Sequence, residues 1–470
     1  MLLRNASALE WGMPPAPELV DVRLTGGTIA EIGHRLERRA AEAVFDLEGA
    51  RLVPGLHDHH LHLRALAAVE SSVIVGPPEI QNAHELSERL RTAGAHLMEG
   101  QWLRGVAYHQ SVAGDLDRWR LDALVPDRPV RIQHASGVLW ILNSAGIAAL
   151  DIRGDAPAGA ERDDTGVLTG RFWREDEWLG SRLPRTSHDF SGLSQLAASR
   201  GVTGFTDATP GAHEVDLAGY LEAVENKTLV QRLCLMAEPG VAEPESELVT
   251  LGPTKVLLDD MTLPTFDELA AQIRHAHDAD RPVAVHCVTR TQSILTLAVL
   301  EQVGVHEGDR IEHGSILGVD AIATIARLGI CVVTQPGFIV TRGDRFLRDV
   351  PAPSRPDLYR LGSLLAAGVV VAGSTDAPFG DPDPWVGLQA AALRRTLGGQ
   401  VLGPEEGVDG PTALALFTGD AAAPARQRTV AVGQPADLCV VEPGTAGYAA
   451  GPGPEIRATF VAGRLIYTAP

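Results

Sequence analysis

Five residues with metal-binding side chains follow strand-like stretches of this sequence. His60 and His62 lie two apart at the end of one such stretch, where alternate residues point the same way, so both imidazoles can reach one cation. His286, His313 and Asp376 each come at the carboxyl end of another apolar stretch. Any one of these histidines fits a buried structural residue as well as a ligand. The five together indicate a metal site that activates water.

Lys255, in Pro253-Thr-Lys-Val-Leu-Leu258, is a sixth candidate. A lysine amine that is desolvated at the mouth of a barrel has a lowered pKa and can react with carbon dioxide. The carbamate that forms offers oxygen ligands that can bridge two cations. A salt bridge with Asp259 or Asp260 is the alternative interpretation.

The elements that must position these residues alternate between helix-like and strand-like segments from Thr265 onward. Thr265-x-x-Glu268 reads as a capping box at the start of a helix, and further helices are predicted at 293–303, 319–328 and 357–367. The predicted strands are 51–56, 130–134, 203–207, 229–236, 255–258, 282–286, 310–313, 330–335 and 369–372. This order predicts a parallel α/β sheet, either a closed (β/α)₈ TIM-type barrel or an open doubly wound sheet. Nine candidates for eight barrel strands mean that at least one is misassigned.

The two ends of the chain are richer in β-type segments, at 20–32 and 44–53 and again at 437–441 and 458–467. We expect these segments to pair as one small β-sandwich domain. The predicted boundaries are 1–54 for its N-terminal part, 55–423 for the hydrolase barrel and 424–470 for its C-terminal part.

Composition limits the partners of the chain. With 470 residues, 45% of them hydrophobic and 21% charged, it can bury a large core. The net charge of −20 argues against binding to nucleic acid or to an anionic membrane. No apolar stretch predicts a membrane span or a signal peptide, and four widely spaced cysteines predict neither disulfides nor a thiolate zinc site. We therefore expect a cytoplasmic protein that acts on a small molecule, with homo-oligomer formation left open.

Over nearly its whole length the sequence resembles the amidohydrolase superfamily, and within it the type 3 branch that includes N-substituted formamide deformylases. The matching motifs are Pro54-Gly-x-x-Asp-x-His-x-His62, Asn143-Ser144, Gly201-Val-Thr203, Lys255, His286, Arg310-Ile-Glu-His313, Gln335-Pro336, Asp376-x-Pro378, Asp383-Pro-Trp385, Gly433-Gln-Pro-Ala-Asp437 and Gly463-Arg464. The order and type of the ligands make the resemblance specific, although no single motif does.

The resemblance implies a hydrolase that cleaves the C–N bond of a small N-acyl, N-formyl or cyclic amide, other than a peptide bond, with a metal-activated hydroxide. His60, His62 and Asp376 would hold the more buried metal, and His286 and His313 the more exposed one. Lys255, carboxylated, would lie between two divalent cations, with Zn²⁺ as the default. Asp376 would act as general base and then as general acid.

Some positions differ from the usual sequence of the branch, and these differences concern substrate binding. The branch usually has Ala-x-Gly-Asp after the histidine of the fifth strand, whereas this chain has Cys287-Val-Thr-Arg290. Arg290 could bind a substrate carboxylate, or pair with a surface acid. Tyr108, His109 and His134 lie on segments that could also reach the site, with Tyr108 as a donor to an oxyanion.

Two other functions remain open. A heterocycle deaminase of the same superfamily would use one metal and a glutamate near His286, and residues 283–292 contain no glutamate. A catalytically silent assembly subunit would have lost ligands, whereas each matched position keeps one. About two, one or no metal ions per chain would distinguish the three functions.

Overall fold

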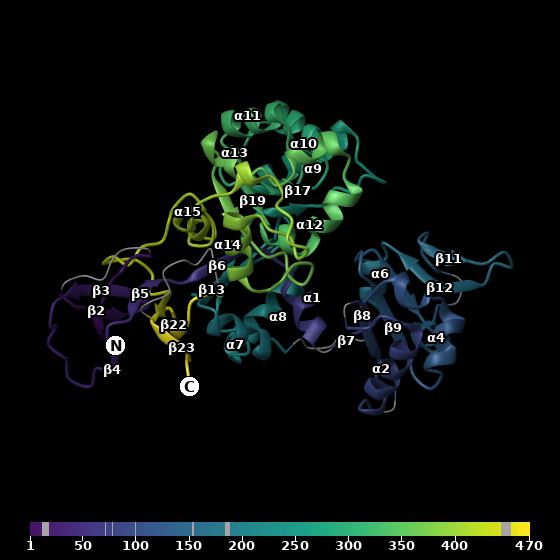
Figure 1. The fold of residues 1–470 in the computed structure, drawn as a ribbon, viewed down its shortest axis with the longest axis horizontal. Helices are drawn as coiled ribbons and strands as arrows, with labels where there is room; N and C mark the ends of the chain where they lie inside the picture. The colour runs from purple at the N-terminus through teal and green to yellow at the C-terminus, as the bar shows by residue number, and fades with distance from the viewer. Residues whose placement is uncertain are drawn as a thin grey trace. The chain divides into compact units, whose positions relative to one another are not determined.

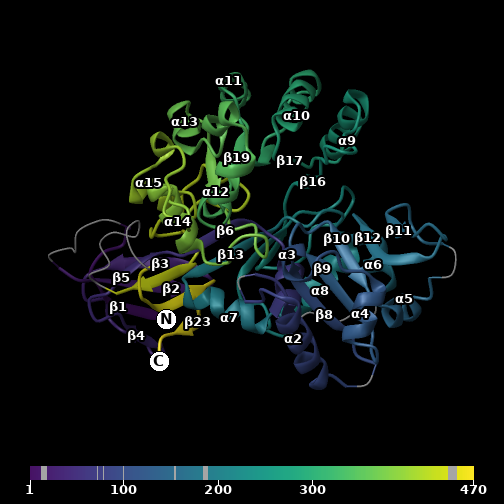
Figure 2. The same cartoon turned by 45° about the vertical axis from the view of Figure 1, so that its right-hand side comes forward.

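The computed structural model describes residues 1–11, 18–70, 72–77, 79–98, 100–152, 155–183, 189–442 and 453–470. The chain forms two compact units (Figures 1 and 2). We call Met1–Leu63 together with Asp189–Pro470 the main unit, and Arg64–His188 the inserted unit. The predicted site residues from His60 to Asp376, apart from those at 108, 109 and 134, belong to the main unit.

The two ends of the chain form two four-stranded sheets in the main unit. Their orders are β3-β2-β1-β4 and β23-β22-β21-β5. The strands are β1 (Leu2–Ala6), β2 (Val20–Thr25), β3 (Thr28–Gly33), β4 (Val44–Asp46), β5 (Arg51–Pro54), β21 (Leu438–Val441), β22 (Ile456–Val461) and β23 (Arg464–Thr468). β5 pairs antiparallel with β21, so the N-terminal and C-terminal segments share a sheet as predicted. One hydrophobic cluster includes Leu3 and Val22 of the first sheet and Val440 and Phe460 of the second.

Parallel strands form two further sheets, of order β15-β14-β13-β6 and β16-β17-β18-β19-β20. The strands are β6 (Leu56–Leu61), β13 (Val202–Asp207), β14 (Arg232–Leu235), β15 (Val249–Leu251), β16 (Thr254–Val256), β17 (Val283–Cys287), β18 (Arg310–His313), β19 (Cys331–Thr334) and β20 (Val371–Gly373). Their buried side chains are mostly apolar, as expected for strands covered on both faces. No single closed ladder joins all of these strands among the described residues.

Two local features connect these sheets. β15 pairs with β14 and β16 pairs with β17, and only Gly252 and Pro253 separate the two strands. Proline has no backbone N–H to donate to a ladder, which explains the interruption. At the opposite edges of the two sheets, hydrogen bonds join the residues that follow β20 to the end of β6. The amide of Asp376 donates to the carbonyl of His60 at 2.8 Å, and the amide of His62 donates to the carbonyl of Ala377 at 2.8 Å.

Helices follow most of the parallel strands. They are α7 (Ser191–Ser199), α8 (Glu214–Glu225), α9 (Phe266–Asp278), α10 (Arg290–Val303), α11 (Val319–Leu328), α12 (Gly337–Asp349), α13 (Leu361–Ala366), α14 (Pro384–Leu393) and α15 (Gly410–Ala415). The capping box predicted at Thr265 is confirmed: its hydroxyl accepts from the amide of Glu268, whose carboxylate accepts from the amide of Thr265. α10 begins three residues earlier than predicted because Thr289 forms a second capping box with Gln292. The helix predicted at 357–367 is shorter, since residues 358–360 are not helical.

The inserted unit contains a six-stranded sheet of order β11-β12-β10-β9-β8-β7 and six helices in its described part. Its elements are α1 (Leu63–Glu70), β7 (Val73–Ile74), α2 (Ala83–Ala95), β8 (Leu103–Tyr108), α3 (Gln110–Ala113), α4 (Arg118–Leu124), β9 (Val130–His134), β10 (Leu139–Leu142), α5 (Ser144–Ala149), β11 (Ala160–Arg162), β12 (Leu168–Trp173) and α6 (Asp176–Arg182). Assigning residues 130–134 to the parallel sheet of the main unit was therefore wrong, because β9 pairs with β8 and β10. None of the helices in the described ranges is both long and apolar enough to span a bilayer.

Candidate metal centre

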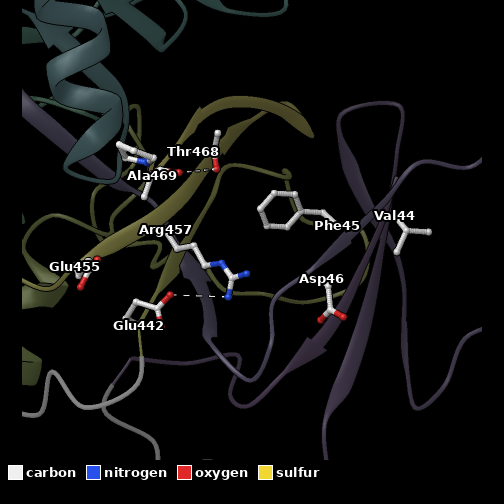
Figure 3. A pocket seen from close by; sticks show the side chains of 9 residues that line it. Val44, Phe45, Asp46, Glu442, Glu455, Arg457, Thr468 and Ala469 are labelled. Carbon is white, nitrogen blue, oxygen red and sulfur yellow. Dashed lines mark hydrogen bonds and ion pairs between the residues drawn. The ribbon is translucent and has the colours of Figure 1, made fainter.

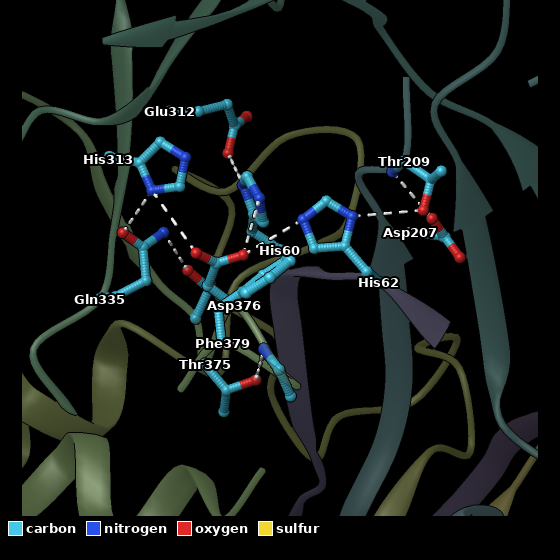
Figure 4. A network of polar contacts seen from close by, with 12 residues as sticks. His60, His62, Asp207, Thr209, Glu312, His313, Gln335, Thr375, Asp376 and Phe379 are labelled. Atoms are coloured by element: carbon cyan, nitrogen blue, oxygen red, sulfur yellow. Dashed lines mark hydrogen bonds and ion pairs between the residues drawn. The ribbon is translucent and has the colours of Figure 1, made fainter. Parts of the chain in front are cut away.

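Two histidines and an aspartate converge where β6 ends and where the chain leaves β20 (Figure 4). Oδ1 of Asp376 lies 3.4 Å from Nε2 of His60 and 3.2 Å from Nε2 of His62. The ligand atoms of the three residues all lie within 4.8 Å of one another. His60 is completely buried and Asp376 nearly so.

The protonation of His60 makes this arrangement fit a cation. Nδ1 of His60 contacts a carboxylate oxygen of Glu312, which can only accept, so Nδ1 carries the proton and Nε2 presents a lone pair. Burial holds the pKa of His60 well below 6.5, which keeps the ring neutral. Nε2 of His60 and Oδ1 of Asp376 therefore face each other as two acceptors, and both are buried with no hydrogen-bond partner in the described part of the chain. A divalent cation would satisfy both atoms, and imidazole with carboxylate is a donor set that zinc accepts.

Glu312 is itself held by a buried arginine. Nε of Arg310 donates to Oε1 of Glu312 at 2.6 Å, and Nη2 of Arg310 donates to the carbonyl of His59 at 3.2 Å. Both side chains are almost fully buried. The pair fixes the orientation of the carboxylate and, through it, the ring of His60.

The other two histidine rings near Asp376 also make contacts through their Nδ1 atoms. Nδ1 of His62 lies 3.2 Å from the hydroxyl of Thr209. Nδ1 of His313 donates to Oε1 of Gln335 at 2.8 Å (Figure 4). Gln335 in turn donates to the hydroxyl of Ser374 at 2.9 Å. Because Nδ1 of His313 donates, its Nε2 presents a lone pair, and His62 does the same when its Nδ1 donates to Thr209.

The second group of predicted ligands lies beside the first. The ring of His313 is 4.8 Å from that of His60 and 4.5 Å from that of His286, measured between centroids. Burial, and then the charge of Lys255, lowers the pKa of His286 to about 3. Burial is the largest cause of the lowered pKa values of His60 and His313; the charge of Lys255 lowers both further, after the charges of His60 and His286 in the case of His313.

Lys255 is buried and its Nζ has no hydrogen-bond partner among the described residues. It makes no ion pair there with Asp259 or Asp260, and Asp260 instead accepts from the hydroxyl of Thr289 at 2.9 Å. Burial lowers the pKa of Lys255 from its ordinary value, opposed by the charges of Glu312 and Asp376. A partly desolvated amine of this kind is easier to deprotonate than an exposed lysine, which is the condition for nucleophilic reactivity.

Backbone strain occurs at two of these residues. His313 has φ of 70° and Asp376 has φ of 54°, a left-handed conformation that costs a residue with a Cβ roughly 1–2 kcal/mol. At the end of β18 this turn breaks the alternation of the strand, so that His313 and its neighbour Glu312 both reach the cluster. Such strain concentrates at functional sites, where the surrounding structure maintains it.

The predicted substrate-binding residues have partners of their own. Arg290 is half-exposed and pairs with Asp357. Tyr108, His109 and His134 lie in the inserted unit. The hydroxyl of Tyr108 donates to the carbonyl of Gly114 at 2.6 Å, and the rings of His109 and His134 stack at 5.8 Å. Their roles toward a substrate stay predictions.

Sequence reasoning missed Glu312, Gln335, Thr209 and Asp58. Asp58 accepts from the amide of Thr375 at 3.0 Å and so ties β6 to the segment after β20; burial raises its pKa to about 7. Glu312 lies inside the quoted motif that ends at His313, and an acidic side chain directly before a predicted ligand was the signal that could have identified it.

A hollow of about 450 Å³ lies elsewhere in the main unit, between strands of the terminal sheets (Figure 3). It is lined by Val44, Phe45, Asp46, Glu442, Glu455, Arg457, Thr468, Ala469 and Pro470. None of the six predicted metal ligands lines it, so it does not belong to the candidate metal centre.

The comparisons with known proteins identify the family of the chain. A model of the amidohydrolase family matches residues 43–467, so the chain belongs to the amidohydrolase family, in its type 3 branch. It is 27% identical over 456 residues to the N-substituted formamide deformylase of Arthrobacter pascens. The alignment covers 84% of each protein.

Solved structures show the fold. The chain is similar to an uncharacterized metal-dependent hydrolase from Pyrococcus horikoshii OT3, with a TM-score of 0.78 and 19% identity over 96% of this chain and 98% of that one. A second uncharacterized metal-dependent hydrolase, from Pyrococcus furiosus, gives a TM-score of 0.75 and 21% identity over 94% of this chain and 99% of that one. The chain therefore has the TIM-barrel-like α/β fold of the amidohydrolases.

Proposed function

We propose that this protein hydrolyses the amide-type C–N bond of a small N-acyl, N-formyl or cyclic amide. The family supports hydrolysis of a C–N bond, and the relative from Arthrobacter pascens is named for removal of a formyl group from N-substituted formamides. The observation that carries the proposal is the pair of facing acceptors, Nε2 of His60 and Oδ1 of Asp376, in a buried cluster that a cation would complete.

The architecture that we propose is a closed (β/α)₈ barrel with a terminal β-sandwich. β15 and β16 would be two halves of one strand, which gives eight strands in the order β6, β13, β14, β15 with β16, β17, β18, β19 and β20. The hydrogen bonds between His60 and Asp376 and between His62 and Ala377 support closure between the last strand and the first. Residues 55–423 would then be the barrel domain, including the inserted unit, and 1–54 with 424–470 the sandwich.

Two cations per chain, Zn²⁺ by default, would occupy the centre. His60, His62 and Asp376 would hold one, His286 and His313 the other, and Lys255, as its carbamate, would join them. When bound, the cations would lower the pKa of a water molecule and polarise the substrate carbonyl. A cation also removes the cost of leaving buried acceptors unpaired.

Asp376 is the proton carrier in this proposal. Its carboxylate accepts a proton from the attacking water as the water oxygen bonds to the carbonyl carbon, and delivers that proton to the nitrogen as the C–N bond breaks. The products are a carboxylic acid and an amine, which balances one amide with one water. Burial of Asp376 among the histidines restricts other water from the carboxylate.

An activity screen of N-formyl, N-acyl and lactam compounds on the metal-reconstituted protein tests the proposal, with the metal content measured on the same sample. Hydrolysis with about two ions per chain is the expected result. Deamination with one ion, or no turnover and no metal, would contradict it.

Asp376→Asn should abolish hydrolysis and leave the fold intact, because the amide is isosteric but a poor base. Asp381→Asn is a matched control, since Asp381 is exposed in the same loop. Near-normal turnover by Asp376→Asn would remove this residue from the mechanism.

A further inference from the structure

Two arginines of the inserted unit lie directly opposite each other on neighbouring strands. Arg104 of β8 and Arg131 of β9 are register partners in a parallel pair, so their side chains leave the same face of the sheet (Figure 2 labels both strands). Like charges in opposite positions destabilise a sheet. The arrangement therefore needs a compensating interaction.

Trp140 of β10 supplies part of that compensation. The guanidinium carbons of Arg104 and Arg131 lie 5.5 Å and 5.4 Å from the centre of its ring, within the range of cation–π attraction. The indole N–H of Trp140 donates to Oδ1 of Asp176 at 2.7 Å. An aromatic ring cannot neutralise charge, and one nearby carboxylate cannot balance two guanidinium groups.

The hydrogen-bonding capacity of the two arginines is almost unused. Nη1 of Arg104 donates to the hydroxyl of Ser72 at 2.7 Å. Arg131 makes no side-chain hydrogen bond or ion pair within the described ranges, and its Nε is buried without a partner. Each guanidinium has five N–H donors in a rigid fork. Burial lowers the pKa of both side chains to about 10, so both keep their charge at neutral pH.

We propose that Arg104 and Arg131 form a binding site for an oxyanion, a carboxylate or phosphate group of a small molecule. An oxyanion that contacts both guanidinium groups would neutralise the excess positive charge and accept hydrogen bonds from the free N–H groups, which is how arginine recognises carboxylates and phosphates. Both side chains are partly exposed, so a solute can reach them. The site lies wholly in the inserted unit and does not depend on the function proposed for the metal centre.

Protection from an arginine-specific reagent tests the site in the unaltered full-length protein. The protein is treated with phenylglyoxal in sodium chloride, sodium phosphate or sodium acetate of equal ionic strength, and the modification of each arginine is followed by peptide mass mapping. Binding slows modification by a factor of 1 + [L]/Kd, so an anion at twice its Kd slows it about threefold. We expect phosphate or acetate to protect Arg104 and Arg131 but not Arg91, which is 65% exposed on α2.

The two anions distinguish the source of the oxyanion. Protection by phosphate alone indicates a phosphate ligand, and protection by acetate, with or without phosphate, indicates that the site accepts a carboxylate. Equal rates in all three salts would overturn the proposal.

Variants give an independent measurement. In the wild-type protein we expect the bound anion to raise the melting midpoint above its value in chloride. Arg131→Gln should lose that increase and Arg91→Gln should keep it. An increase of the same size in Arg131→Gln would also overturn the proposal, and if this variant does not fold, the protection experiment decides.

Discussion

Replacing Glu312 by glutamine should weaken metal binding, although all six proposed metal ligands are still present in this variant. The carboxylate of Glu312 now accepts from Nδ1 of His60 and from Nε of Arg310 at 2.6 Å. Glutamine keeps the shape, but only one of its two terminal atoms can accept. If its NH₂ group faces His60, Nδ1 must become the acceptor, the proton moves to Nε2, and the lone pair that would bind the cation is lost.

The magnitude follows from the burial of the network. Loss of a partner that orients a metal-binding histidine typically weakens metal affinity about 10–100-fold, or roughly 1.4–2.8 kcal/mol. Removing one partner of a buried ion pair costs about 3–5 kcal/mol of stability, and Glu312 is completely buried. An amide oxygen that still accepts from Arg310 would keep the loss of stability below about 3–5 kcal/mol.

Two measurements separate the role of Glu312 in orientation from a role in stability. Metal affinity is measured by competition with a chelator, and stability by urea unfolding of the metal-free protein. Glu301→Gln is the matched control, because Glu301 pairs with Arg327 on the surface, and it should change stability by no more than about 1 kcal/mol and leave metal affinity unaltered. Wild-type metal affinity in a folded Glu312→Gln protein would refute the reasoning.

Three further predictions concern the lysine, a buried histidine and the terminal sheets. Lys255→Ala should lose bound metal and activity, and short carboxylic acids should restore part of both; full metal content in this variant would support a structural role for Lys255 instead. Burial holds the pKa of His57 far below 6.5, so the folded metal-free protein keeps it neutral while the unfolded chain takes up a proton as the pH falls below about 6.5. Stability is therefore lost toward acid, and His57→Gln should reduce the slope of stability between pH 6 and 5 by about 1.2 kcal/mol per pH unit; an unchanged slope in urea titrations would contradict this. Phe460→Ala should cost about 3–5 kcal/mol, because Phe460 is fully buried in the cluster that contains residues of both terminal sheets, whereas the same change at exposed Leu465 should cost far less; equal unfolding free energies would refute a shared core.

Features encoded by short-range periodicity could be predicted from the sequence. β17 and β18 lie within one residue of their predicted bounds, and α11 has the predicted bounds. The pair His60 and His62 converges on one aspartate because a spacing of two residues keeps two side chains on the same side of a strand. The family, too, follows from motifs that are local in the chain, and the family model confirms it.

Pairing between segments that are distant in the chain could not be predicted from short-range periodicity. Residues 130–134 have a strand pattern, but the pattern does not say which sheet the strand joins, and it joins the inserted unit. The same holds for Arg104 and Arg131, which face each other only because of the register between β8 and β9.

What the sequence by itself determined is the class of chemistry: the ligand types, their order and the alternation of helices and strands. Tertiary structure decided which groups orient the ligands. Strand alternation places Glu312 and His313 on opposite faces, whereas a φ of 70° at His313 and the approach of β6 bring both to the same cluster. Periodicity specifies which face of an element is buried, but neighbours and register depend on long-range packing, which no local pattern records.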